Sequence, residues 1–212
     1  MPGLSHHDHA LDSLRQQDIG TEFGVFPCGA AFAFLPTHRY AEISQFVQLS
    51  GATTCVYPDT NGDFAFAPVI TRVQAENPKL KFRIVLGEAG PGEVSLRELI
   101  DRPAKLPASR LADIRIDPTD PCIFQLSGGT TGIPKLIPRT NNDYAYNSKA
   151  AADVCELDAE SVLLLVLPIA HNLPLACPGI QGFLFKGAKV VLHANTRPAE
   201  MFALIQKHKV TH

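Results

Sequence analysis

The sequence contains no long hydrophobic run. Its longest aliphatic run, Val162–Leu167, has the length of a β-strand and ends at Pro168, whereas a membrane-spanning helix needs about 20 apolar residues. The first residues, MPGLSHHDHALDSL, also lack the continuous apolar segment of a signal peptide. These absences exclude a membrane-spanning protein and predict a cytoplasmic one with no membrane partner.

Cysteine pairs are also missing. The five cysteines are an odd number, lie far apart and include no CxxC pair, which argues against a disulfide framework and a zinc site. We expect them to be mostly buried free thiols. His6, His7 and His9 form an HHxH cluster, which we interpret as part of a mobile terminus rather than as a metal site.

The sequence has no excess of charge of one sign. It contains 19 lysines and arginines against 21 aspartates and glutamates, for a net charge of −2, and the basic residues are scattered. A protein of this charge has no general electrostatic attraction to nucleic acid. We therefore expect no nucleic-acid partner.

Short apolar runs alternate with segments of helical spacing from Gly29 onward. The expected strands are Gly29–Leu35, Thr53–Tyr57, Phe82–Leu86, Cys122–Leu126, Lys135–Ile137, Val162–Leu167 and Lys189–Leu192. The expected helices are Arg39–Ser50, Pro68–Glu76, Ser95–Asp101, Asn142–Cys155, Pro174–Phe185 and Pro198–His208. Ser95, with Glu98 three residues later, is the expected cap of the third helix, and Asn141 or Asn142 that of the fourth. A further strand is expected to start at Val210–His212. This alternation predicts an α/β fold with a mainly parallel sheet flanked by helices on both sides. Residues 102–120 are expected to be a surface connector rather than a domain boundary.

The stretch LSGGTTGIPKLIPRT, residues 126–140, has the composition of a phosphate-binding loop. Glycines let backbone N–H groups approach phosphate oxygens, hydroxyls add donors, and a lysine adds charge. The spacing does not fit GxxxxGK[ST], and Pro134 and Pro138 prevent a helix from starting there. We therefore expect a strand–loop–strand device over a triphosphate, with these phosphate-binding residues: Ser127, Gly128, Gly129, Thr130, Thr131, Gly132 and Lys135.

A second motif, AHNLP, follows the strand that is expected to end at Leu167. Open α/β sheets bind ligands at the carboxyl ends of their strands, so His171 and Asn172 are well located for a substrate. A capped helix start is the alternative interpretation of the same pair. Cys177 comes five residues after Asn172, about one and a half helical turns along, and is expected in the same pocket.

The strings LSGGTTGIPKLIPRTNNDY, LPIAHNLPLACPGIQG and FLPTHRYAEISQF resemble the adenylate-forming superfamily, and within it the aryl-acid–AMP ligases of siderophore biosynthesis. The resemblance covers roughly Gly29 to His212. It implies that residues 29–212 are a partial AMP-binding (adenylation) domain, truncated before the ribose-binding and C-terminal lid regions. Residues 1–28 are then a divergent N-terminal segment.

The resemblance implies a two-step reaction that uses ATP and Mg²⁺. An aryl carboxylate attacks the α-phosphate, and the acyl-adenylate then passes to the thiol of an aryl carrier protein or of coenzyme A. In this family the asparagine at the position of Asn172 contacts the acid, and the histidine matching His171 lies at the edge of the site. The position of Cys177 is typically serine in 2,3-dihydroxybenzoate enzymes and cysteine in salicylate enzymes, so salicylate is the expected acid and 2,3-dihydroxybenzoate the alternative.

The resemblance also predicts limits. The family's magnesium and adenine motif, ribose-binding aspartate and C-terminal lysine are not found in this sequence, so we expect no complete catalytic set and little or no ligase activity from the isolated chain. Two alternatives remain at this point. One is a non-catalytic remnant that binds a nucleotide or aryl acid, and the other is a fragment of a general acyl-CoA ligase, which would carry hydrophobic residues in place of His171 and Asn172.

Overall fold

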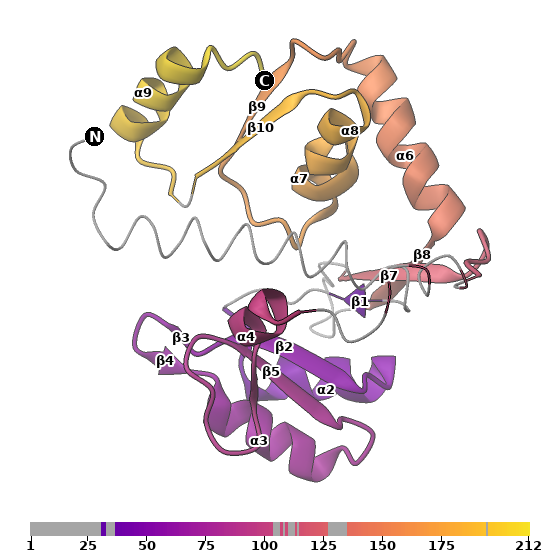
Figure 1. The fold of residues 1–212 in the computed structure, drawn as a ribbon, viewed down its shortest axis with the longest axis vertical. Helices are drawn as coiled ribbons and strands as arrows, with labels where there is room; N and C mark the ends of the chain where they lie inside the picture. Colours follow the sequence, from indigo (N-terminus) through magenta and orange to yellow (C-terminus); the bar gives the residue numbers. More distant parts are fainter. Residues whose placement is uncertain are drawn as a thin grey trace. The chain divides into compact units, whose positions relative to one another are not determined.

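The structure, a computed structural model, describes residues 31–32, 37–103, 107, 109, 113, 115–126, 135–193 and 195–212. The chain forms two compact units. Unit 1 comprises Met1–Ala33 and Ile114–His212, and unit 2 comprises Phe34–Asp113 (Figure 1). The two units therefore divide within residues 102–120, where the sequence indicated a connector rather than a boundary.

Unit 2 contains a parallel three-stranded sheet of order β2-β5-β6. Its strands are β2 (Thr54–Pro58), β5 (Phe82–Leu86) and β6 (Val94–Ser95). Its helices are α2 (Tyr40–Ser50), α3 (Ala67–Glu76) and α4 (Leu96–Asp101), and a small hairpin joins β3 (Thr60–Asn61) to β4 (Phe64–Ala65). Burial of aromatic and aliphatic side chains drives this packing; the fully buried ones include Phe46, Tyr57, Phe66, Ile70, Val73 and Val85.

Unit 1 contains two sheets. In the first, β1 (Ala31–Phe32) runs parallel to β7 (Pro121–Leu126), and β7 pairs antiparallel with β8 (Leu136–Thr140). In the second, β9 (Val162–Leu165) runs parallel to β10 (Lys189–Leu192). The last residues lie along β9, because the N–H groups of Thr211 and His212 donate to the carbonyl oxygen of Val162 at 3.0 and 3.1 Å. This agrees with the strand start expected at Val210–His212.

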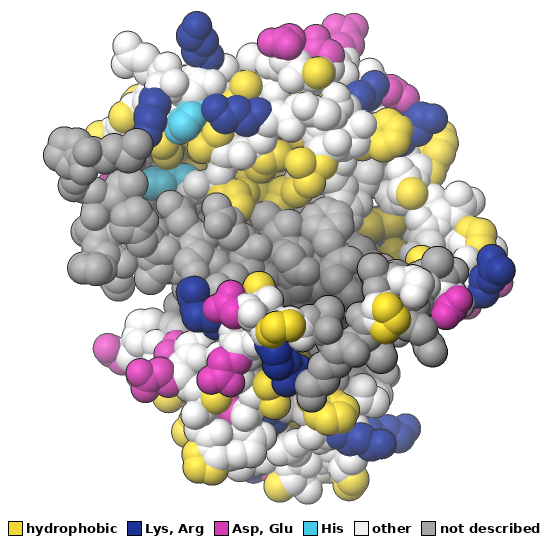
Figure 2. Space-filling view, viewed as in Figure 1, with side chains coloured by type: hydrophobic (Ala, Val, Ile, Leu, Met, Phe, Trp, Pro, Cys, Tyr) yellow, Lys and Arg dark blue, Asp and Glu magenta, His cyan; other side chains and the backbone are white. Residues whose placement is uncertain are grey.

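Four helices pack in unit 1, namely α6 (Asn141–Val154), α7 (Asn172–Ala176), α8 (Gly179–Phe185) and α9 (Pro198–His208). Helix α8 contacts β9, β10 and α6 (Figure 1). One apolar cluster at this contact comprises Ala152, Leu157, Phe183 and Ala188, and a second comprises Leu165, Ile169 and Ile180. Large apolar side chains also remain exposed on unit 1, and Figure 2 shows hydrophobic side chains at the surface; the exposed ones include Tyr146, Val154, Leu173, Phe185 and Phe202.

The α/β fold with mainly parallel strand pairing is confirmed, and three local expectations need correction. Thr140, not Asn141 or Asn142, caps α6, because its hydroxyl accepts from the Asp143 N–H at 3.1 Å. The strand expected to reach Leu167 ends at Leu165 and is largely half-buried.

The third correction concerns Pro174–Phe185, which is two helices rather than one. Pro178 has no N–H to continue α7. At Gly179, where φ is +40°, a Cβ atom would lie 2.2 Å from the carbonyl oxygen of Pro174, so only glycine fits the turn between the two helices. The break therefore follows from a Pro-Gly pair inside the expected helix.

Within the described parts of the chain, no helix is long and apolar enough to cross a membrane. The same parts hold no group of three or more His, Cys, Asp or Glu residues arranged to bind a metal ion. The expected N-terminal segment 1–28, with its HHxH cluster and Cys28, lies outside the described residues, as does most of the expected strand Gly29–Leu35.

Candidate functional site

The β7–β8 hairpin carries the phosphate-binding motif. Leu126, the last residue of β7, pairs with Leu136, the first residue of β8, so the two ends of the intervening segment lie side by side. The expected strand–loop–strand arrangement is therefore confirmed at its two flanks, which exclude a Walker-type loop that opens a helix. Residues 127–134, with six of the seven expected phosphate-binding residues, lie outside the described residues. Lys135 is described and is exposed.

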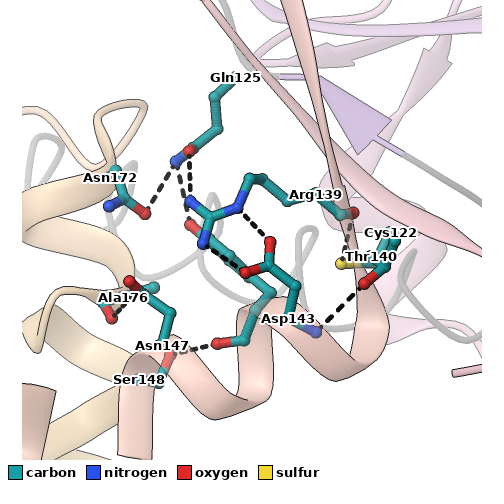
Figure 3. Close-up of polar contacts among 10 residues, drawn as sticks. Cys122, Gln125, Arg139, Thr140, Asp143, Asn147, Ser148, Asn172 and Ala176 are labelled. Atoms are coloured by element: carbon teal, nitrogen blue, oxygen red, sulfur yellow. Dashed lines mark hydrogen bonds and ion pairs between the residues drawn. The ribbon is translucent and has the colours of Figure 1, made fainter. Parts of the chain in front are cut away.

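Gln125 joins this hairpin to the second motif. Its Nε2 donates to Oδ1 of Asn172 at 3.1 Å and to the hydroxyl of Tyr144 at 3.2 Å, and its Oε1 accepts from Nη1 of Arg139 at 3.2 Å. Figure 3 shows Gln125 between Asn172 on α7 and Arg139 on β8. The bond to Asn172 spans 47 residues of sequence. It brings the AHNLP motif to the end of β7, two residues before Ser127.

An ion pair fixes Arg139 from its other side. Nε and Nη2 of Arg139 donate to the two carboxylate oxygens of Asp143, the second at 3.1 Å (Figure 3). The hydrogen bond from Arg139, together with the charge of its guanidinium, holds the pKa of Asp143 below its ordinary value. The guanidinium also lies over the ring of Tyr144, 5.2 Å from its centroid. A planar fork held by two oxygens has little freedom to reorient.

Helix α7 is tied at both ends. At its start, Asn172 accepts from Gln125 of β7, and at its end the carbonyl oxygen of Ala176 accepts from Nδ2 of Asn147 on α6 at 2.7 Å (Figure 3). Leu175 and Ala176 of α7 are buried in one cluster with Cys122, Ile123 and Tyr144. These contacts fix where the first residue of α7 lies, although a helix of this length has little stability of its own.

His171 immediately precedes α7 in the N-cap position, and its side chain forms no capping hydrogen bond. The ring is exposed. The alternative interpretation of the pair as a helix start is thus confirmed for the backbone, but the His171 and Asn172 side chains do not cap the helix. Asn172 instead turns toward β7. The two neighbours therefore differ, since Asn172 is part of a polar network and His171 is presented to solvent.

Cys177 follows the end of α7 rather than continuing it, because α7 ends at Ala176. The helical spacing assumed between Asn172 and Cys177 is therefore wrong. Cys177 is half-buried and borders a groove of about 510 Å³ along α6. The residues that line this groove are Asp143, Tyr146, Asn147, Ala150, Ala151, Val154, Cys155, Cys177 and Pro178. Asn172 and His171 are not among them, so a pocket shared by Asn172 and Cys177 stays a prediction.

Sequence reasoning missed Gln125 and Arg139. The available signal at Gln125 was a lone amide near the end of an otherwise apolar strand, CIFQL. Arg139 lies in the strand after the glycine loop, where a charged residue is readily interpreted as solvent-exposed. Nothing in the local pattern of either residue indicates that Gln125 contacts Asn172 or that Arg139 contacts Gln125.

Comparisons with known proteins show the family of this chain. Residues 19–212 match the family described as AMP-binding enzyme. A 2,3-dihydroxybenzoate-AMP ligase of Bacillus subtilis is 41% identical over 190 residues, which are 89% of this chain and 34% of that protein. A salicyl-AMP ligase / salicyl-S-ArCP synthetase of Mycobacterium tuberculosis is 41% identical over 177 residues, which are 84% of this chain and 30% of that protein.

Among solved structures, apo MbtA of Mycobacterium smegmatis is 36% identical with a TM-score of 0.78, and the match covers 90% of this chain and 34% of that one. The chain thus spans about a third of the length of the curated relatives it matches. These matches and the strand–loop–strand hairpin confirm the resemblance inferred from the three sequence motifs. The chain belongs to the AMP-binding enzyme family.

Proposed function

We propose that this chain supplies the phosphate loop and part of the acid-binding wall of an enzyme that activates an aryl acid as its adenylate. The observation that carries this proposal is the hydrogen bond between Gln125 and Asn172 at 3.1 Å. It joins the strand that leads into the glycine loop to the helix that carries the second motif. A nucleotide phosphate bound by the loop and an acid bound by Asn172 would then be neighbours, as transfer between them requires.

The proposed chemistry is attack of the acid's carboxylate on the α-phosphate of ATP, which releases pyrophosphate and forms the acyl-adenylate. The acyl group then passes to a thiol, either the phosphopantetheine of a carrier protein or coenzyme A. In this chain the glycine-loop residues Ser127–Gly132 and Lys135 would hold phosphate oxygens. Asn172, His171 and Cys177 would contact the acid. Positioning and charge neutralisation, rather than covalent catalysis, are what such residues contribute.

The described residues contain no cluster of metal-binding side chains for Mg²⁺. No three carboxylate, imidazole or thiolate side chains gather in the described parts of the chain, and Mg²⁺ at a nucleotide is typically held by one or two carboxylates together with phosphates and waters. ATP with Mg²⁺ remains the proposed co-substrate.

For the acid, we propose salicylate in preference to 2,3-dihydroxybenzoate. Cys177 is half-buried and lies directly after α7. A thiol is a weak hydrogen-bond partner, so a second ring hydroxyl placed against it would lose its hydrogen bonds to water without full replacement. The named relatives include enzymes of both kinds, a salicyl-AMP ligase and a 2,3-dihydroxybenzoate-AMP ligase.

Calorimetry with the 212-residue chain tests the proposal. The ligand is a non-hydrolysable salicyl-adenylate analogue, titrated beside the matched 2,3-dihydroxybenzoyl and benzoyl analogues. We expect saturable binding of the analogue that weakens in N172A, and binding of ATP that weakens in K135A, because Asn172 would contact the acid and Lys135 the β- and γ-phosphates, which the analogue lacks. The affinity for ATP should not fall in N172A. Absence of binding, or binding that neither substitution weakens, would refute the proposal.

A further inference from the structure

Three side chains form a continuous row from β8 to α7. Arg139 donates to Gln125 at 3.2 Å, and Gln125 donates to Asn172 at 3.1 Å (Figure 3). Asp143 holds the far side of Arg139 through both of its carboxylate oxygens. The side chain of Arg139 is 18% exposed, and Gln125 and Asn172 are half-buried. The row is thus screened from water along most of its length.

The direction of this row is fixed by chemistry. A guanidinium has five N–H donors and no acceptor, so Gln125 must turn its oxygen toward Arg139. Its NH₂ group then donates to the Tyr144 hydroxyl and to Asn172, and within the Asn172 amide only the oxygen can accept. The NH₂ group of Asn172 is consequently left on the other side. Among the described residues, none accepts a hydrogen bond from it.

We infer that Gln125 and Arg139 are positioning residues that set the polarity of the Asn172 amide. By holding Oδ1 of Asn172, they present its two N–H donors to an oxygen of the bound acid. This inference rests on the proposed function, in which Asn172 contacts an aryl acid. A carboxylate and a phenolic oxygen are both acceptors, so a site for either needs a donor and is harmed by a carbonyl oxygen.

The effect of this arrangement on binding follows from how the Asn172 amide would orient without the hydrogen bond from Gln125. A free asparagine side chain presents its oxygen or its nitrogen with similar ease and must be ordered when the ligand arrives. Removing the amide of Gln125 is therefore expected to weaken ligand binding by about 3- to 10-fold, the range of one hydrogen bond. Glutamate at this position has no N–H group. It would draw the NH₂ of Asn172 toward itself and turn the Asn172 oxygen toward the ligand.

A double-mutant cycle tests the inference. The affinity of the 212-residue chain for the salicyl-adenylate analogue is measured by calorimetry in Q125M, Q125E and N172A and in the two double variants. We expect Q125M to weaken binding about 3- to 10-fold alone and less than about 2-fold in the N172A background. Q125E should weaken binding more than Q125M, and most of that excess should vanish when Asn172 is absent. The excess that persists measures the added charge alone.

Two further variants complete the design. Q181M makes the same substitution on α8 in the same unit, and Gln181 contacts Ser148 at 2.9 Å rather than Gln125 or Asn172; its affinity should match that of the unmodified chain. R139M removes the fixed donor from the opposite end of the row and, measured alone and as R139M/N172A, should show the same coupling to Asn172 as Q125M. Thermal unfolding of every variant identifies any that do not fold, and R139M tests the row if Q125M is one of them.

The outcomes are separable. If the unmodified chain does not bind the analogue, the proposed function fails and the inference fails with it. If it binds, and the losses in Q125M and N172A simply add, Gln125 has only a structural role and the inference alone is overturned. If the losses do not add and Q125E exceeds Q125M only when Asn172 is present, Gln125 sets the amide polarity as inferred.

Discussion

Replacing Glu93 by alanine is expected to destabilise unit 2 strongly, because it leaves a buried arginine without its anion. The side chains of Arg83 and Glu93 are 9% and 4% exposed, and Nη1 of Arg83 lies 3.6 Å from Oε1 of Glu93. The carboxylate also accepts from the Tyr57 hydroxyl at 2.7 Å and from the Gly90 N–H at 2.8 Å. Arg83 already has one buried nitrogen, Nε, with no hydrogen-bond partner.

The magnitude follows from burial. Removing one member of a buried ion pair costs about 3–5 kcal/mol, because the remaining charge is left desolvated and uncompensated. Unit 2 offers a matched control in Arg72 and Glu76, whose Nε and Oε1 atoms lie 3.0 Å apart and whose side chains are 62% and 40% exposed. Exposed pairs contribute about 0–1 kcal/mol. E76A should therefore change the free energy of unfolding far less than E93A.

Urea unfolding followed by circular dichroism gives the free energies, and amide hydrogen exchange in β2 and β5 shows that the loss lies in unit 2. We also expect the double replacement R83M/E93L to recover most of the loss, because paired apolar side chains leave no buried charge. Equal losses in E93A and E76A, or no recovery in the double variant, would show that burial of this pair does not control the stability of unit 2.

The same carboxylate predicts a pH dependence. Burial raises the pKa of Glu93. Hydrogen bonds from Tyr57 and Gly90 and the charge of Arg83 together lower it by more than burial raises it, so the net pKa lies below the ordinary value of 4.5. A lowered folded pKa stabilises the fold above the unfolded value, and that contribution is lost as the pH falls through the folded value. The loss on acidification should be smaller in E93A than in the unmodified chain, which acid titration of the urea midpoint would reveal.

Three other predictions concern unit 1 and the thiols. In C177S, the hydroxyl should improve binding of the dihydroxybenzoyl-adenylate analogue relative to the salicyl one by about 3- to 10-fold, the range of one hydrogen bond. If the ratio of the two affinities measured by calorimetry does not change, Cys177 is not a specificity residue. Burial raises the pKa of Cys55 to about 12, so Cys55 should resist a thiol reagent at pH 8 in the folded chain while exposed Cys155 reacts. Mass spectrometry of timed reactions measures both rates, and prompt labelling of Cys55 would contradict its burial. T140A removes the cap of α6 and should lower the free energy of urea unfolding by about 0.5–2 kcal/mol. N142A, with an exposed side chain outside the cap, should lower it less, and the reverse order would show that Asn142 is the cap.

Much of the fold could be predicted from local patterns. β5, β10 and α9 have the bounds that the sequence predicted, and α4 begins at the serine cap expected from Ser95 and Glu98. These elements are determined by apolar periodicity and capping residues, which act over a few neighbours. Errors arose where local signals conflicted. Pro178 and Gly179 divide one expected helix into two, and Thr140 caps α6 in place of Asn141 or Asn142.

The glycine-rich string and the HN pair determined the family, because close backbone approach to phosphate allows few residue types at that spacing. The sequence also identified Asn172 as a candidate ligand contact. Only the tertiary structure decided which atom of that amide the protein itself holds, namely Oδ1, which accepts from Gln125. Gln125 contacts Asn172 across 47 residues of chain and Arg139 across 14, and the direction of these hydrogen bonds depends on Arg139 having donors alone. No local pattern records such contacts, since they exist only once β7, β8 and α7 have packed together.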